Sequence, residues 1–203
     1  MFTGIIESEG RLVSRISEGS NLVLRISTSL DEPIKVDQSI AHNGVCLTVV
    51  EIFRNDPHGE KEYAVVAVDE TLKKSNLGTL QDGGIINIER CLKAGQRMDG
   101  HFVQGHVDTT ARVTKVELLE GSWFFHFAFP SEFRNLLVDK GSVCVNGVSL
   151  TVVTCDDAQF SVTVIPYTFE HTNFRTLKVG DAVNLEFDIL GKYLLKMYGH
   201  RPV

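Results

Sequence analysis

The chain contains one sequence pattern twice, about a hundred residues apart, and this repeat restricts its fold more than any other feature. Residues 39–50 read SIAHNGVCLTVV and residues 142–153 read SVCVNGVSLTVV, so that eight of twelve positions are identical. Two further pairs of segments keep the same order and a similar spacing: 71–89 with 168–186 and, more weakly, 2–13 with 103–113. Three matching blocks in one order predict two tandem copies of one domain, and two copies are too few for a solenoid or a propeller.

The repeat divides the chain into three predicted parts. A length of 203 residues suits one or two domains at ~150 residues each. The run KAGQRMD at residues 93–99 interrupts the strand pattern and marks the boundary between the copies. We therefore expect a first domain at 1–97, a second domain at 98–188 and a C-terminal helical tail at 189–203.

Each copy has the composition of a small β-barrel. Short runs rich in Val, Ile, Thr and Phe alternate with polar positions and end at Gly, Asn and Asp, which is typical of strands. The predicted strands are 4–13, 21–27, 38–42, 45–53, 62–68 and 85–89 in the first copy, and 106–116, 123–128, 142–145, 148–154, 160–165 and 182–187 in the second. Helical periodicity is confined to 70–77, 131–138 and the tail from residue 189. Six antiparallel strands can close into a barrel without exposed edges, so the predicted fold class is all-β, with two homologous six-stranded barrels in tandem.

An Asn-Gly pair lies between two predicted strands in each copy, at residues 43–44 and 146–147. Such pairs favour tight hairpin turns, and most isolated examples have no other role.

The strands that follow these turns are predicted to have one apolar face and one polar face. The polar faces consist of small hydrogen-bonding side chains: Cys46 and Thr48 in the first copy, Ser149 and Thr151 in the second. These faces could orient a heterocyclic ring through hydroxyls and backbone amides, or they could be ordinary solvated strand faces. Their presence in both copies favours ring binding. The exchange of Cys46 for Ser149 suggests two pockets that bind similar ligands in unequal roles.

Composition limits the other classes of function. A net charge of −6 and a pI near 5.6 argue against a nucleic-acid surface or an anchor to anionic membranes. The four cysteines form no CxxC spacing and are too few for a disulfide framework. No apolar run approaches the ~20 residues of a membrane helix. We expect a soluble protein of the reducing cytoplasm, with neither nucleic-acid nor membrane partners.

Several familiar site patterns are missing or weak. His101 and His106 are five residues apart, so on a strand they would point to opposite faces and form a poor metal pair. Cys144 and Cys155 have no ligand spacing and are expected to be buried small side chains. Dinucleotide, phosphate-loop, zinc-protease and hydrolase motifs do not occur, and no metal site is expected.

Five motifs together give the chain a specific resemblance: MFTGI at the N-terminus, NGVCLTV, NGVSLTV, GHFVQGHVD and NLEFD. The chain resembles the riboflavin synthases of the α-chain type over essentially its whole length. This resemblance implies Greek-key barrels followed by a C-terminal helix, which is expected to be short in this chain, and a dismutation without metal or organic cofactor. Two molecules of 6,7-dimethyl-8-ribityllumazine would exchange a four-carbon unit, giving riboflavin and 5-amino-6-ribitylamino-2,4-pyrimidinedione in the final step of riboflavin biosynthesis. It also implies a homotrimer, in which the first barrel of one subunit meets the second barrel of another.

The resemblance implies the site residues as well. The pocket of the first barrel would contain Phe2, Gly4, Ile5, Ile6, Ser39, Cys46, Leu47, Thr48, Val66, Ala67, Val68, Asp69, Glu70 and Thr71. The pocket of the second barrel would contain Gly105, His106, Val107, Lys140, Ser149, Leu150, Thr151, Val164, Ile165, Pro166, Tyr167, Thr168 and Phe169. The catalytic candidates are Cys46, Ser39, His106, Ser149, Thr151 and Asp188.

The roles within this set are hypotheses. His106 is suited to moving protons near neutral pH, Cys46 or Ser39 could assist proton removal or supply a nucleophile, and Asp188 could orient its partners. The tail after Ile189 is shorter than is usual in the family, so the trimer is expected to be weak or concentration-dependent. The main alternative is a non-catalytic lumazine- or flavin-binding fluorescent protein of the same fold. A flavin-dependent oxidoreductase would need a nucleotide-binding domain, for which the chain has neither the length nor the glycine motif.

Overall fold

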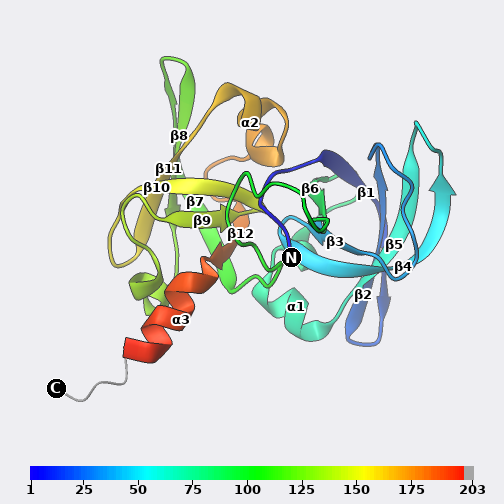
Figure 1. The fold of residues 1–203 in the computed structure, drawn as a ribbon, viewed down its shortest axis with the longest axis horizontal. Helices are drawn as coiled ribbons and strands as arrows, with labels where there is room; N and C mark the ends of the chain where they lie inside the picture. Colours follow the sequence, from blue (N-terminus) through cyan, green and yellow to red (C-terminus); the bar gives the residue numbers. More distant parts are fainter. Residues whose placement is uncertain (199–203) are drawn as a thin grey trace.

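The computed structural model describes residues 1–198 as two closed β-barrels joined side by side, with a helix at the C-terminal end (Figure 1). The first barrel contains β1 (Ser8–Glu18), β2 (Asn21–Thr28), β3 (Ser39–His42), β4 (Val45–Asn55), β5 (Lys61–Ala67) and β6 (Ile85–Arg90). Its strands are antiparallel and close in the order β1-β2-β5-β4-β3-β6. Because β6 returns to lie beside β3 after the β3-β4-β5 meander, the barrel is a Greek key.

The second barrel repeats this topology. It contains β7 (Thr109–Leu119), β8 (Ser122–Ala128), β9 (Ser142–Val145), β10 (Val148–Cys155), β11 (Gln159–Val164) and β12 (Ala182–Phe187). Its closed order is β10-β11-β8-β7-β12-β9, which matches the first barrel strand for strand. The predicted fold class is therefore confirmed, whereas the domain boundary at residue 97 stays a prediction.

The first strand of each copy begins later than the sequence predicted. β1 begins at Ser8 instead of residue 4, and β7 begins at Thr109 instead of residue 106. Gly4 and Gly105 have φ angles of +78° and +81°, which strand residues do not adopt, so the backbone turns away from the barrel before each strand.

Short helical segments connect the strands. They are α1 (Asp69–Lys74), η1 (Leu77–Thr79), η2 (Ser131–Leu136), α2 (Pro166–Glu170), η3 (Asn173–Thr176) and α3 (Ile189–Tyr198). The helix predicted at 70–77 is interrupted at Ser75, whose backbone is extended, and the segment predicted at 131–138 is a 3₁₀-helix. The sequence did not predict α2, which begins at Pro166; a proline is well suited to the first helical turn because its missing N–H needs no partner there.

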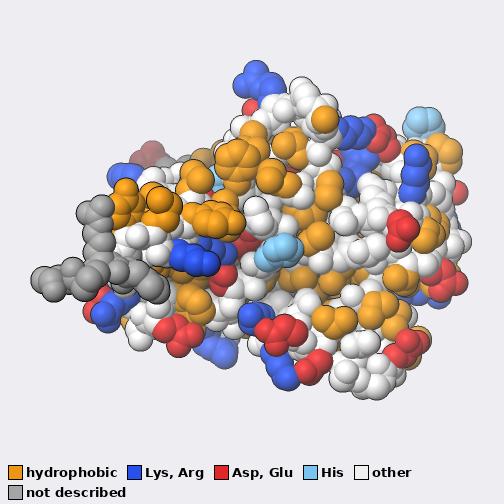
Figure 2. Space-filling view, turned by 60° about the horizontal axis from the view of Figure 1, so that its bottom comes forward, with side chains coloured by type: hydrophobic (Ala, Val, Ile, Leu, Met, Phe, Trp, Pro, Cys, Tyr) orange, Lys and Arg blue, Asp and Glu red, His pale blue; other side chains and the backbone are white. Residues whose placement is uncertain are grey.

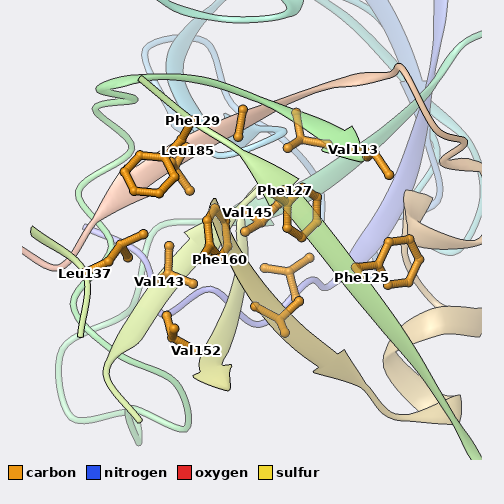
Figure 3. Packing of buried hydrophobic residues seen from close by; sticks show 14 of the residues in the cluster. Val113, Phe125, Phe127, Phe129, Leu137, Val143, Val145, Val152, Phe160 and Leu185 are labelled. Carbon is orange, nitrogen blue, oxygen red and sulfur yellow. The ribbon is translucent and has the colours of Figure 1, made fainter. Parts of the chain in front are cut away.

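Each barrel has its own apolar core. Alternate residues of the strands point inward, as in β2, where Leu22, Leu24 and Ile26 are buried between more exposed neighbours. The core of the second barrel is rich in aromatic rings, and the Phe127 and Phe160 rings lie with their centroids 5.0 Å apart in its centre (Figure 3). Full burial of each such side chain stabilises the fold by about 1.5–3 kcal/mol.

The two Asn-Gly turns are hairpins, and they also hold the barrels together. All four of their residues have positive φ, between 47° and 83°, as type I′ turns require. The turns pack against each other, because a Cβ atom on Gly44 would lie only 2.8 Å from the backbone nitrogen of Gly147. Only glycine allows such close contact, so the turns form the centre of the interface between the barrels.

Buried asparagines complete this interface in a reciprocal pattern. Asn87 Nδ2 donates to the Asn146 carbonyl oxygen at 2.9 Å, and Asn184 Nδ2 donates to the Asn43 carbonyl oxygen at 2.8 Å. Asn173 joins the same network through its backbone N–H, which donates to Asn87 Oδ1 at 2.7 Å. Each amide bridges the two copies, so the barrels have a fixed relative orientation.

Replacing Asn87 with alanine tests the strength of this interface. The Asn87→Ala change leaves the Asn146 carbonyl and the Asn173 N–H buried without their partners, so we expect the free energy of unfolding to fall by about 2–4 kcal/mol. Urea unfolding followed by circular dichroism measures the change. The control Asn135→Ala alters an exposed residue of η2 and should stay within about 0.5 kcal/mol of wild type. Equal effects of the two substitutions would contradict this account.

Candidate active site

The first candidate site lies on the outer face of β3 and β4; we call it the N-site and define it by Ser39, Cys46, Thr48, Gly105 and His106. Ser39 lies opposite Thr48 in the ladder, and its side chain hydrogen-bonds to the Cys46 thiol. Cys46 and Thr48 alternate with buried residues and so point away from the core, as the sequence predicted. The Cys46 N–H donates to the Gly105 carbonyl oxygen at 2.8 Å, which places a segment of the second copy against this face.

The second candidate site is the equivalent face of β9 and β10; we call it the C-site and define it by Ser149, Thr151, Gly4, His101 and Asp188. The Ser149 N–H donates to the Gly4 carbonyl oxygen at 2.8 Å. His101 Nδ1 and Ser149 Oγ form a hydrogen bond of 2.7 Å. The negative charge of Asp188 favours the protonated form of the His101 imidazole. Ser149, His101 and Asp188 therefore form one polar cluster. From the sequence, His101 was considered only as a poor metal ligand, and its contact with Ser149 was not predicted.

The glycine segments contact strands of the opposite copy, which the sequence did not predict, while the pocket that each one lines stays a prediction. The segment 4–6 was expected in the pocket of the first barrel and the segment 105–107 in that of the second, but each lies against the opposite barrel. A Cβ atom on Gly4 would lie 2.6 Å from the Cβ of Ser149, and one on Gly105 would lie 2.5 Å from the Cβ of Cys46. We call residues 3–6 and 104–107, which include these segments, the walls of the sites, since each covers a strand of the other copy.

A buried glutamate holds each wall. Glu89 on β6 accepts hydrogen bonds from the Thr3 N–H at 2.7 Å, the Thr3 hydroxyl at 2.8 Å and the Gly4 N–H at 3.0 Å. Glu186 on β12 accepts them from the N–H groups of Gln104, Gly105 and His106 at 2.6, 3.0 and 3.0 Å. The side chains are equivalent in the two copies. Sequence reasoning missed both, although the repeated endings INIE and VNLE contain them.

The environment changes the proton affinity of several of these groups. Burial raises the pKa of Glu89 to about 7, although the N–H and hydroxyl donors oppose the shift, and burial raises the pKa of Glu186 in the same way. Burial lowers the pKa of His101, with the Asp188 charge opposing it, so its imidazole is neutral at pH 7. Burial also raises the pKa of Cys46, although the hydrogen bond with Ser39 opposes this shift. The Cys46 side chain is therefore a protonated thiol in the isolated chain.

The structure places the other predicted residues in different surroundings. Leu47, Leu150 and Val164 direct their side chains into the barrel cores, which leaves only their backbone groups for a ligand at the strand surface. Phe2 is fully buried between the copies, where its backbone pairs with Val103 and its ring lies close to Gly105. Its ring therefore packs beside the Gly105 segment of the N-site, and its role in shaping that site stays a prediction.

Two more groups of predicted residues border the sites. The end of β5 and the start of α1 contain Val66, Ala67, Val68, Asp69, Glu70 and Thr71, and the equivalent part of the second copy contains Val164, Ile165, Pro166, Tyr167, Thr168 and Phe169. Phe169 stacks on Trp123 with centroids 3.7 Å apart, and Tyr167 is 69% exposed. Ile5 is half-exposed, whereas Ile6 packs against the second core and Val107 against the first. Lys140 is exposed in a positive-φ turn before β9.

Asp188 lies at the junction of the second barrel and α3. Its carboxylate accepts a hydrogen bond from the Leu190 N–H at 3.0 Å, so it also stabilises the start of the helix.

Both wall segments also line cavities. One of about 510 Å³ touches Thr3 and Ile5, and another of about 520 Å³ touches Gln104 and His106.

Some expectations about cysteines, metals and membranes can be compared with residues 1–198. Cys144 is buried as predicted, but Cys155 is only half-buried, because it lies at the end of β10 where its backbone N–H donates to Asp139. In this part of the chain, no cluster of three or more His, Cys, Asp or Glu side chains could hold a metal ion. None of its helices has the length and apolar character needed to cross a membrane.

Known proteins share this pattern. The family model described as the lumazine binding domain matches the chain twice, at residues 3–91 and 104–188, so the fold and its paired sites define a duplicated lumazine-binding-domain protein. The riboflavin synthase of Actinobacillus pleuropneumoniae is 36% identical over 100% of this chain and 92% of its own length. That of Bacillus amyloliquefaciens is 39% identical over 97% of this chain and 89% of its own, and that of Mycobacterium bovis 38% over 97% and 98%. The chain belongs to the riboflavin synthase family.

A solved structure supports the fold. The crystal structure of LumP complexed with riboflavin superposes with a TM-score of 0.81 at 20% sequence identity, covering 92% of this chain and 99% of that one. The same fold with the ligand 6,7-dimethyl-8-(1'-D-ribityl) lumazine gives a TM-score of 0.79.

The raised pKa of Glu89 predicts a pH dependence of stability. The folded protein binds this proton more tightly than the unfolded chain, so Glu89 stabilises the fold fully below pH 4.5, and this contribution is lost as the pH rises to about 7. The shift from 4.5 to about 7 corresponds to at most roughly 3–4 kcal/mol. Between pH 4.5 and 7, wild type should therefore lose stability relative to Glu89→Gln, as measured by urea unfolding at several pH values.

The exposed Glu120 provides a control for this experiment. Glu120→Gln should follow the wild-type pH profile. A constant difference in unfolding free energy between wild type and Glu89→Gln over the whole range would contradict the prediction.

Proposed function

We propose that the protein converts two molecules of 6,7-dimethyl-8-ribityllumazine into riboflavin and 5-amino-6-ribitylamino-2,4-pyrimidinedione, the final step of riboflavin biosynthesis. The observation that carries this proposal is the pair of matched sites, in which one backbone frame presents Cys46 at the N-site and Ser149 with His101 at the C-site. A reaction between two copies of one molecule in unequal roles needs two similar sites with different reactive groups. Membership of the riboflavin synthase family supports the same reaction.

The polar strand faces would bind the lumazine rings. Thr48 and Thr151 are exposed on their strands, and the backbone groups of the walls lie close beside them. Holding two rings face to face replaces a bimolecular encounter in solution, and well-oriented reactants reach effective molarities of ~10⁵–10⁸ M.

The reaction needs one lumazine to lose a proton from its 7-methyl group and the other to accept a nucleophile. His106 is exposed beside the N-site and is our candidate for moving protons. The neutral His101 can accept a proton from Ser149, which would make this hydroxyl the nucleophile at the C-site, with Asp188 stabilising the resulting imidazolium. Cys46, as a thiol, and Ser39 would donate hydrogen bonds to the ligand at the N-site.

We also propose that the active site is completed by a second chain, in a homotrimer formed through α3. Leu190, Tyr193, Leu194 and Met197 are between 54% and 69% exposed on this helix, which packs against η2 of its own chain. Figure 2 shows hydrophobic side chains gathered on the surface in the left half of the view. The expected tail continues to residue 203, and its last part, 199–203, lies outside the described residues. A helix of this size buries little area, so the trimer should dissociate on dilution.

The cytoplasm is the proposed location, and the four free cysteines agree with a reducing compartment. The alternative function is that of a fluorescent lumazine- or flavin-binding protein, since LumP shares the fold. The presence of Cys46, His106 and Ser149 at the sites favours the enzyme, and product formation distinguishes the two functions.

Incubation with 6,7-dimethyl-8-ribityllumazine should produce one riboflavin for every two lumazines consumed, measured by absorbance and chromatography. His106→Gln, Cys46→Ser, Ser149→Ala and Asp188→Asn should each lower the turnover number, with losses of about 10²–10⁴-fold where a proton transfer is lost. His58→Gln, in the exposed β4–β5 hairpin, is the control and should retain full activity. Bound lumazine without any riboflavin formed would support the fluorescent-protein alternative and overturn the enzyme.

Sedimentation tests the assembly. The wild-type chain should shift from trimer towards monomer across a dilution series, and Leu194→Glu should move this transition to a higher concentration because it places a charge on the apolar face of α3. Lys196→Gln on the same helix is the control. A wild-type monomer at every concentration would refute the trimer.

A further inference from the structure

Neither Glu89 nor Glu186 has a part in the chemistry above, yet each is almost fully buried and directed at a wall of a site. Glu89 is 4% exposed and Glu186 is 2% exposed. Each carboxylate accepts three hydrogen bonds from a single short segment of its own copy. Burial of a carboxyl group is costly without such partners, so this repeated arrangement calls for an explanation.

We propose that Glu89 and Glu186 are positioning residues, each of which holds the wall of the ligand site on the opposite barrel. Glu186 would hold Gly105 and His106 at the N-site, and Glu89 would hold Thr3 and Gly4 at the C-site. The inference rests on the proposed function, because it assumes that the two sites bind lumazine rings.

The first argument is the match between acceptors and donors. Three N–H or O–H donors of one wall converge on two oxygen atoms at 2.6–3.0 Å. Above pH 7, where Glu89 is ionised, its carboxylate offers acceptors only, with about four lone-pair positions. A glutamine offers one acceptor oxygen, and its NH₂ group would face a backbone N–H. The charged side chain therefore fixes its wall in a way that its nearest neutral equivalent does not.

The second argument is the tight fit of the walls. On the far side of each wall, the glycine carbonyl accepts the hydrogen bond from Ser149 or Cys46, and neither glycine leaves room for a Cβ atom. Each wall is thus fastened to a glutamate of its own barrel and to a strand of the other barrel. A small displacement of the wall changes the site directly, and for the N-site it moves His106 as well.

The third argument is that each glutamate holds a wall of the site on the other barrel, so its loss is expected to affect ligand binding at that site only. Glu89 belongs to the first barrel but holds a wall of the C-site, whereas Glu186 belongs to the second barrel but holds a wall of the N-site. A side chain that only stabilised its own barrel would weaken that barrel's site or both sites together. A positioning residue weakens the site on the other barrel alone.

The experiment measures binding at each site of the full chain. The probe is an 8-ribityllumazine with a 7-oxo group in place of the 7-methyl group, which cannot lose the methyl proton and so is not turned over. Calorimetric titration gives the number of probe molecules per chain, and crystals soaked in the probe show which site holds it. The wild-type chain should bind two.

Glu186→Gln should weaken binding about ten- to a hundredfold at the N-site and leave the C-site unchanged, and Glu89→Gln should do the reverse. The matched control Glu120→Gln should bind two probes with wild-type affinities. Thr3→Val removes the hydroxyl that donates to Glu89 and accepts from the Ile5 N–H within the same wall, but keeps the two backbone donors to Glu89, so it should produce a smaller loss, confined to the C-site. This variant tests the proposal even if a glutamate variant fails to fold.

The proposal is overturned if Glu186→Gln and Glu89→Gln bind two probes with wild-type affinity, if each weakens both sites equally, or if each weakens the site on its own barrel. It is overturned in the same way if Thr3→Val leaves the C-site unchanged. These results would leave the proposed function intact, because the wild-type chain would still bind two probes. A wild-type chain that binds no probe would instead overturn the proposed function itself.

Discussion

The contact between two glycine turns, Gly44 and Gly147, determines how the rest of the molecule is arranged. Because neither turn has side-chain atoms at the contact, the barrels approach closely enough for asparagine amides to bridge them. An unpaired amide in this buried layer costs free energy, so the network tolerates one relative orientation of the barrels. That orientation brings the segment before each barrel onto the strands of the other.

Because of this orientation, each site is formed by residues of both copies. Each has a strand surface from one copy and a wall from the other, and the buried Phe2–Val103 pair lies between the walls. The residues that differ between the sites, such as Cys46 and Ser149, lie on an almost identical backbone frame. The two sites therefore differ chemically only in their side chains, whereas the backbone that would position a bound ring is nearly the same in both.

Most of the fold could be predicted from the sequence, because strand periodicity and the repeat are local patterns. The strand β9 and the strand β12 have the predicted bounds, and Cys46 and Thr48 face outward as alternation requires. The partners of the walls could not be predicted, because nothing local states which barrel a segment contacts after a positive-φ glycine. Glu89 was missed for a related reason: in a strand it resembles any solvated carboxylate until its distant partner, Thr3, is known.

The exchange of walls between barrels also bears on how such a chain can originate. A lone barrel would lack one side of its binding surface, but two free copies related by a twofold axis could supply that side to each other. In such a homodimer both surfaces must remain identical. Joining the copies in one polypeptide removes this symmetry requirement, so that a residue such as His101, next to Ser149, needs no counterpart beside Cys46. Fusion therefore permits the division of labour that identical subunits forbid.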